Sequence, residues 1–173
     1  SMPNLVIVQP RDGNVLEEIL NSDFVFNVPS VIRYSNIPTN FSSKNHLRKR
    51  IIGDSELLRV GKEIVIIGVG HMAYTAIEVA ENLEKNGLNS YVIDPVFISP
   101  LDTKAFSSSF LKGKIIVTIE DGLCKSGFAF IFNNYLINKN ISFKKILNFG
   151  VKDEVVKHGE YERIIRSLGL DSD

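Results

Sequence analysis

The strongest constraint on the fold is a regular alternation of short apolar runs with helical patterns, which begins at Leu57. Buried strands of parallel sheets are short and continuously apolar, whereas helices repeat their apolar residues about every third or fourth position. The alternation favours an α/β fold with a doubly wound, mostly parallel sheet. The predicted strands span residues 63–67, 91–93, 114–119 and 144–148, and the predicted helices span residues 72–85, 100–111, 128–137 and 161–168.

A smaller unit precedes this domain. Residues 5–8 and 31–34 predict two strands, and residues 14–21 between them predict a helix that Asp12 can cap. In the stretch that follows, the periodicity disappears and Asn, Ser, Pro and basic residues dominate. The sequence therefore predicts three parts, which are a partial α/β unit over residues 1–35, a surface linker over 36–56 and a complete domain over 57–173.

Charge and residue content restrict the classes of partner. The 173 residues carry 20 basic and 20 acidic side chains, so no net field attracts nucleic acid or an anionic membrane. The basic cluster His46–Arg50 has no interleaved aromatic residues, which favours a solvated linker over a nucleic-acid contact. No apolar run approaches the roughly 20 residues that span a bilayer. The three histidines and the single Cys124 are too scattered for a zinc site of the usual spacing. We therefore expect no nucleic acid, no membrane and no metal on this chain.

One local motif resembles a nucleotide-binding turn. Gly68–Ala73 matches G-x-G-x-x-A after a predicted strand, and Asp94 ends the next strand about 25 residues further on. The alternative interpretation is a tight strand-to-helix turn that needs two glycines and binds nothing. Pro95 directly after Asp94 and the bulky ring of His71 inside the motif favour this second interpretation. A free-standing nucleotide-binding module is kept as the less favoured reading.

Several stretches, taken in order, resemble the C-terminal third of the 1-deoxy-D-xylulose-5-phosphate synthases, a family of the transketolase superfamily. Residues 8–12 are similar to that family's Pro-x-Asp turn, and residues 29–34 to its Gly-Pro-x-x-Ile-Arg-Tyr-Pro-Arg-Gly strand. Residues 96–102 resemble Arg-Phe-Val-Lys-Pro-Leu-Asp, residues 117–121 resemble Val-Thr-Val-Glu-Glu, and residues 168–171 follow the family's Gly-Leu-Asp ending. The resemblance covers nearly the whole chain.

The resemblance implies a domain division and a reaction. Residues 1–35 would be the tail of a pyrimidine-binding domain, 36–56 a linker and 57–173 a transketolase-type C-terminal domain. Synthases of this family condense pyruvate with glyceraldehyde 3-phosphate, with loss of CO2, at the start of non-mevalonate isoprenoid synthesis, and the product also feeds thiamine synthesis. They use thiamine diphosphate and Mg²⁺. The implied partners are the rest of the same polypeptide and a second copy in a homodimer, and the implied location is the bacterial cytoplasm or a plastid-type stroma.

The fragment alone is predicted to be inactive. The family holds the cofactor through a Gly-Asp-Gly…Asn motif and activates it with a glutamate of the middle domain, and neither feature is present here. We therefore expect no catalytic residue, no bound thiamine diphosphate and no Mg²⁺ on this chain. Related alternatives are the C-terminal part of a transketolase or of a 2-oxo-acid dehydrogenase β subunit.

Arg33 is the one residue to which the resemblance assigns a functional role. It matches the arginine that contacts the phosphate of the sugar-phosphate substrate, and a guanidinium fork suits phosphate oxygens. The alternative is a strand-end arginine paired with a carboxylate. The family's Pro-Arg-Gly after this strand is here Ser35–Ile37, and its Gly-Gly-x-Gly turn is here Ser126–Ala129. Glu120 and Asp121 are not expected to act as an acid/base pair, because adjacent strand residues point apart.

Overall fold

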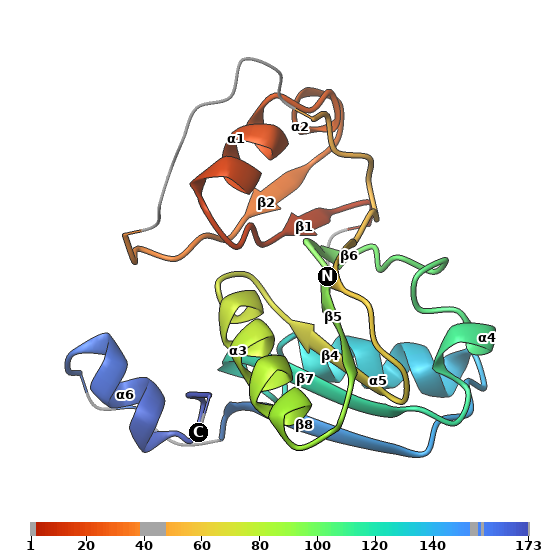
Figure 1. Cartoon of the computed structure of the whole chain (residues 1–173). Coiled ribbons are helices and arrows are strands. Elements are labelled where there is room, and N and C mark those ends of the chain that lie inside the picture. The colour runs from red at the N-terminus through yellow and green to blue at the C-terminus, as the bar shows by residue number, and fades with distance from the viewer. Residues whose placement is uncertain (1–2, 39–47, 153–155, 157, 173) are drawn as a thin grey trace.

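Two β-sheets form the framework of the protein (Figure 1). A computed structural model describes residues 3–38, 48–152, 156 and 158–172. The larger sheet has five strands in the order β3-β5-β4-β7-β8, and the smaller has three in the order β2-β1-β6. The smaller sheet with its two helices lies above the larger one in Figure 1.

The larger sheet is parallel except at one edge. β5, β4, β7 and β8 run parallel, and β3 pairs antiparallel with β5. The predicted doubly wound, mostly parallel α/β fold is therefore confirmed, with one strand more than the sequence predicted. The strands are β3 (Glu56–Arg59), β4 (Ile64–Gly68), β5 (Ser90–Asp94), β7 (Ile115–Leu123) and β8 (Lys145–Val151).

Helices cover both faces of this sheet, and the side-chain alternation of β4 shows why. Val65 and Ile67 pack with α5 (Phe128–Asn138), whereas Ile66 packs on the opposite face with α3 (Met72–Lys85). β4 is therefore apolar on both faces, which explains why it reads as a continuous apolar run. Small alanines on α3 let the helix lie close to the sheet, and Gly87 just beyond its end has φ +78°, as expected for a left-handed terminating residue.

The smaller unit contains the predicted helix and both predicted strands. The Asp12 carboxylate accepts a 2.8 Å hydrogen bond from the Val15 amide and so caps the helix. A third strand from the later part of the chain pairs antiparallel with the first, and its Phe97 packs in the same apolar cluster as Val8 and Ile19. β6 thus contributes to two cores, because Phe97 packs in this cluster and Ile98 packs in the cluster of the larger sheet. The elements are β1 (Val6–Val8), α1 (Gly13–Leu20), α2 (Phe24–Asn27), β2 (Ser30–Ile32) and β6 (Phe97–Ser99).

The helix predicted over residues 100–111 is wrong for most of its length. Only α4 (Ser108–Leu111) is helical there. The Asp102 carboxylate, near the start of the predicted helix, accepts hydrogen bonds from the amide and hydroxyl of Ser55 at 2.9 and 2.8 Å. It also accepts the amides of Lys104 and Ala105, which closes a turn rather than a helix.

The predicted linker is described only at its ends, because residues 39–47, including His46, lie outside the described part. The basic residues that are described have carboxylate partners: Arg48 with Asp54 at 3.8 Å and Lys49 with Asp23 at 2.7 Å. Arg50 is buried, and its pairs with Glu18 and Glu56 measure 2.6 and 2.7 Å. This end of the segment is therefore packed against the smaller unit, while Glu56 already begins β3.

The C-terminal part adds α6 (Tyr161–Ser167) and a short tail. Leu170 is buried with Ile66 and Met72 on the α3 face of the sheet. None of the helices in the described part of the chain has the length and apolarity that a membrane span requires.

Candidate functional site

Arg33 lies where the two units meet. It follows β2, and its amide donates a 2.9 Å hydrogen bond to the Val8 carbonyl, which fixes the backbone beside β1. Its side chain is 49% exposed and reaches across to β7 of the larger sheet, where Nη2 lies 3.3 Å from Oδ1 of Asp121. Arg33 has the carboxylate partner that the alternative interpretation expects, and about half of its side chain remains exposed.

Glu120 and Asp121 point in different directions along β7. Glu120 is buried and accepts the amides of Phe128 and Ala129 at 2.9 and 2.8 Å, at the start of α5. Burial raises the pKa of Glu120, although these amides oppose the rise. A Cβ on Gly127 would lie 2.0 Å from Oε2 of Glu120, so the glycine makes room for this cap. Glu120 is thus a helix-capping residue whose charge also acts on Arg33, whereas Asp121 is the carboxylate that pairs with Arg33.

Side chains from three other segments contact the Asp121 carboxylate. Besides Arg33, Nε2 of Gln9 donates a 3.4 Å hydrogen bond to Oδ1. Nδ1 of His71 lies 3.8 Å from Oδ2, which is an electrostatic contact too long for a hydrogen bond. Gln9 follows β1 and His71 stands at the turn between β4 and α3, so the site brings the ends of β1, β2, β4 and β7 together.

Burial keeps the His71 ring neutral. Burial lowers the pKa of His71, the charge of Asp121 opposes this and the charge of Arg33 adds to it. The ring meets Tyr161 edge-on, with centroids 5.5 Å apart, and its Nε2 is hydrogen-bonded to the Tyr161 hydroxyl. Burial, helped by the charge of Asp121, raises the pKa of Tyr161 to about 12. At neutral pH the net charge of the cluster therefore comes from Arg33 and Asp121.

The glycine motif is occupied by protein atoms. Gly70 has φ +58°, and a Cβ there would lie 2.7 Å from Cγ and Nε2 of Gln9. A Cβ on Gly68 would lie 2.6 Å from the Cα of Ala73, at the start of α3. Asp94, which would contact a ribose in the nucleotide-binding interpretation, is buried and accepts a 2.7 Å hydrogen bond from Arg11. The interpretation as a tight turn accounts for both glycines. Gln9, directly after β1, fills the space in which a pyrophosphate would approach Gly70.

Sequence reasoning did not select Gln9, Asp121 or Tyr161 as parts of the site. Asp121 was considered only as a partner of Glu120, and the other two gave no signal. Gln9 is 112 positions from Asp121, and Arg33 is 88 positions from it. Among the described residues, no three or more His, Cys, Asp or Glu side chains are grouped so that they could hold a metal ion.

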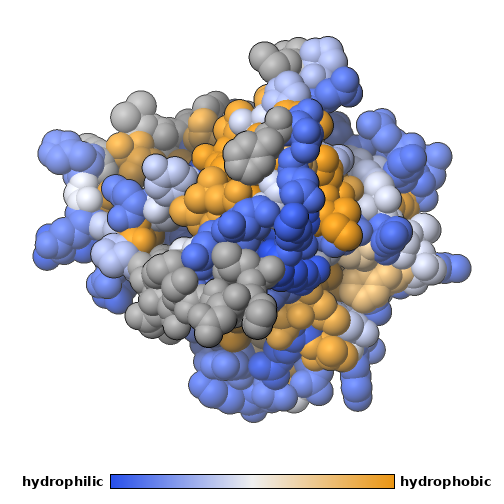
Figure 2. Space-filling model, turned by 90° about the horizontal axis from the view of Figure 1, so that it is seen from above, coloured by the Kyte–Doolittle hydropathy of each residue, from blue (hydrophilic) through white to orange (hydrophobic). Residues whose placement is uncertain are grey.

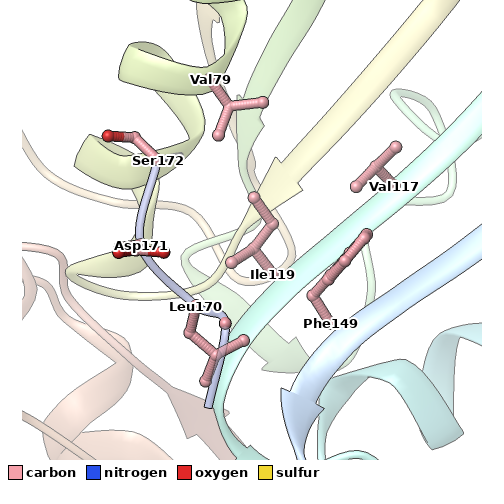
Figure 3. Close-up of a pocket in the computed structure, with 8 residues that line it drawn as sticks. Val79, Val117, Ile119, Phe149, Leu170, Asp171 and Ser172 are labelled. Atoms are coloured by element: carbon pink, nitrogen blue, oxygen red, sulfur yellow. The ribbon is translucent and has the colours of Figure 1, made fainter. Parts of the chain in front are cut away.

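A separate cavity of about 240 Å³ opens on the α3 side of the larger sheet (Figure 3). Val117, Ile119 and Phe149 form its floor, and the tail residues Leu170 and Asp171 border it. None of the side chains grouped around Asp121 lines this cavity. It is mostly apolar and carries no cluster of polar groups, so the Arg33 site remains the better candidate for a phosphorylated ligand.

Comparison with known proteins agrees with the motifs. The 1-deoxy-D-xylulose-5-phosphate synthases of Chlamydia felis and Chlamydia trachomatis serovar L2 are each 36% identical to the chain, over 179 and 176 residues. Both alignments include 100% of this chain and 27% of the relative, so the chain spans about a quarter of the length of these relatives.

Solved structures show the same fold. A split-gene transketolase described as an inactive β4 tetramer has a TM-score of 0.83 at 23% identity, covering 99% of this chain and 55% of that one. The transketolase of Campylobacter jejuni has a TM-score of 0.62 at 21% identity, covering 99% of this chain and 25% of that one.

The resemblance to 1-deoxy-D-xylulose-5-phosphate synthases that the sequence predicted is confirmed. Residues 53–173, most of the chain, match the family described as "Transketolase, C-terminal domain". The chain belongs to this transketolase C-terminal domain family.

Proposed function

We propose that this chain is the C-terminal part of a 1-deoxy-D-xylulose-5-phosphate synthase that condenses pyruvate with glyceraldehyde 3-phosphate with loss of CO2. The support is the identity to such synthases along the whole chain, together with the order of the matching motifs. The second candidate is the C-terminal part of a transketolase or of a 2-oxo-acid dehydrogenase β subunit, and the transketolase structures share the fold at lower identity.

The proposal includes the division predicted from the sequence, with boundaries at residues 35 and 56. The family match beginning at residue 53 supports the second boundary. β2 is an edge strand of the smaller sheet, and Val31 on it is 45% exposed, which suits a segment that continues a larger pyrimidine-binding domain. The remaining domains of the same polypeptide and a second copy are the proposed partners, in the cytoplasm of a bacterium or in a plastid-type stroma.

Thiamine diphosphate and Mg²⁺ belong, in this proposal, to the segments that relatives carry outside this chain. The described residues offer no group of side chains that fits a metal ion, and the sequence holds no Gly-Asp-Gly. When bound, the cofactor supplies the thiazolium carbon that carries the two-carbon unit. This chain contributes Arg33, which positions glyceraldehyde 3-phosphate, and the two sheets that hold Arg33 in place.

Arg33 is proposed to bind the phosphate of glyceraldehyde 3-phosphate. The observation that carries this role is a half-exposed guanidinium at the junction of the two sheets, with Nη2 tied to Asp121. The rest of the planar fork remains available, and such forks bind phosphate oxygens through two parallel, charge-assisted hydrogen bonds.

Steady-state kinetics of a full-length synthase that carries this chain test the role. We expect Arg33→Ala to raise KM for glyceraldehyde 3-phosphate about 10- to 100-fold, because a charged hydrogen-bonding partner is lost, and to leave KM for pyruvate within about twofold. Arg48→Ala is the matched control, because Arg48 is 51% exposed and also has one carboxylate partner. Equal increases of KM for both substrates, or an equal effect of the control, would contradict the assignment.

A further inference from the structure

We propose that Asp121 is a positioning residue that orients the Arg33 guanidinium toward the substrate phosphate. This inference rests on the proposed function and adds a residue to it. The observation that carries it is the convergence of Gln9, Arg33 and His71 on one carboxylate, which joins the smaller unit to β7. The carboxylate is 24% exposed, so it stands at the edge of the open side of the site.

Asp121 is less exposed than Arg33, with 24% of its side chain exposed against 49%. Gln9, which is 3% exposed and lies against Gly70, donates a 3.4 Å hydrogen bond to the Asp121 carboxylate. The ring of His71, 11% exposed, stands on the other side and is fixed by its hydrogen bond with Tyr161. Because this ring is neutral, it does not compete with Arg33 for the charge of the carboxylate.

Arg33, by contrast, is a long and half-exposed side chain that would sample many rotamers without a partner. The 3.3 Å contact between Nη2 and Oδ1 restricts these rotamers and turns one edge of the fork inward. A Cβ on Gly122 would lie 3.4 Å from Nη1 of Arg33 and 2.9 Å from Oε2 of Glu120, so Nη1 lies on the side of the buried Glu120 carboxylate, which is bonded to the start of α5. A phosphate would reach the guanidinium from the half of the Arg33 side chain that remains exposed.

A carboxylate near a phosphate site also repels the phosphate, so orientation and repulsion predict opposite changes in substrate binding when Asp121 is removed. If Asp121 acts by orienting Arg33, its removal weakens binding of the phosphorylated substrate. If repulsion dominates, its removal strengthens that binding. The two effects change KM for glyceraldehyde 3-phosphate in opposite directions.

The test is a double-mutant cycle in a full-length synthase that carries this chain. We expect Asp121→Ala to raise KM for glyceraldehyde 3-phosphate about 3- to 10-fold, with KM for pyruvate and kcat within about twofold. Asp121→Asn keeps an oxygen acceptor at the same reach, so it should lie between the wild type and Asp121→Ala and keeps the test usable if the alanine variant fails to fold. In the Arg33→Ala background, Asp121→Ala should not raise KM for glyceraldehyde 3-phosphate any further, because the residue that it positions is gone.

Asp23→Ala is the matched control, since Asp23 also forms an ion pair, with Lys49, but does not contact Arg33. A lower KM in Asp121→Ala, equal increases for both substrates, or a full additional effect in the Arg33→Ala background would overturn the inference. If Arg33→Ala raises KM selectively while Asp121→Ala does not, only this inference fails. If Arg33→Ala itself has no selective effect, the proposed phosphate site fails as well.

Discussion

Glu56 lies between two arginines at the junction of the units. It accepts hydrogen bonds from Arg11 at 3.1 and 3.2 Å and from Arg50 at 2.7 Å. Burial alone would raise the pKa of Glu56, but the two arginines outweigh burial and lower this pKa to about 2. Because Arg11 also pairs with the buried Asp94, Glu56 belongs to a network that ties the smaller unit to the edge of the larger sheet.

The sign of its effect on stability follows from this depressed pKa. A carboxylate whose pKa falls from 4.5 to about 2 on folding stabilises the protein above pH 4.5, and the contribution is lost as the pH falls toward 2. We expect Glu56→Gln to lower the free energy of unfolding at pH 7 by about 2 kcal/mol, after a discount for the exposed part of the side chain. Urea unfolding at several pH values measures this difference.

Glu84→Gln provides the control, because Glu84 forms a single exposed pair with Arg59 at 2.8 Å. Such surface pairs contribute about 0.5 kcal/mol, so this variant should resemble the wild type at every pH. A Glu56→Gln penalty that stays constant between pH 7 and pH 2.5 would show that the charge of Glu56 is not the source of its effect.

The turn between β4 and α3 packs against the end of β1, and Gly70 lies at this contact. Alanine at Gly70 meets both a left-handed backbone and the side chain of Gln9, which a Cβ would approach to 2.7 Å. Gly113 also has a positive φ, +72°, but a Cβ there would meet nothing within 4 Å. We expect Gly113→Ala to cost about 1 kcal/mol and Gly70→Ala about 2–4 kcal/mol, measured by denaturant unfolding.

The difference between the two glycine variants isolates the packing contribution, because both carry the backbone strain. Equal losses would mean that Gln9 moves aside freely and that the turn is not fixed by the smaller unit. In that case the packing of Gln9 against Gly70 would not fix the position of Gln9 beside Asp121.

Elements with a long and clear period were predictable from the sequence. The helix predicted over residues 72–85 coincides with α3, because its alanines repeat at helical spacing over four turns. β3 and β6 were not predicted, because β3 has a charged residue at each end and β6 lies between Pro95 and Pro100, which local patterns associate with turns. α4 is shorter than predicted, and the turn before it is tied by Asp102 to Ser55, 47 positions away, a contact that local patterns do not encode.

Of the candidate site, only Arg33 was predictable from the sequence. Arg33 was selected through its motif, and its carboxylate partner was anticipated as a type but not as Asp121. The grouping of Gln9, Arg33, His71 and Asp121 depends on the meeting of two sheets, which local patterns along the chain do not encode. Sequence spacing therefore gave the fold class more completely than the site.

At the scale of the molecule, the two units are linked by a shared strand, β6, and by the ion pairs of Arg11. Seen from the side of the smaller unit, the surface shows apolar patches among hydrophilic stretches (Figure 2). Exposed apolar side chains of this unit include Leu20, Val31 and Tyr34. Such patches suit a unit that contacts further protein, as proposed for the tail of a pyrimidine-binding domain.

We propose that the chain completes a synthase specific for pyruvate and glyceraldehyde 3-phosphate. The most direct measurement is the release of CO2 from pyruvate by a full-length protein that carries this chain, with each substrate supplied alone and together, and with thiamine diphosphate and Mg²⁺ present. We predict CO2 release coupled to an equal amount of 1-deoxy-D-xylulose 5-phosphate only when both substrates are present. Transfer of a two-carbon unit from a ketose phosphate without this product would contradict the proposed synthase function.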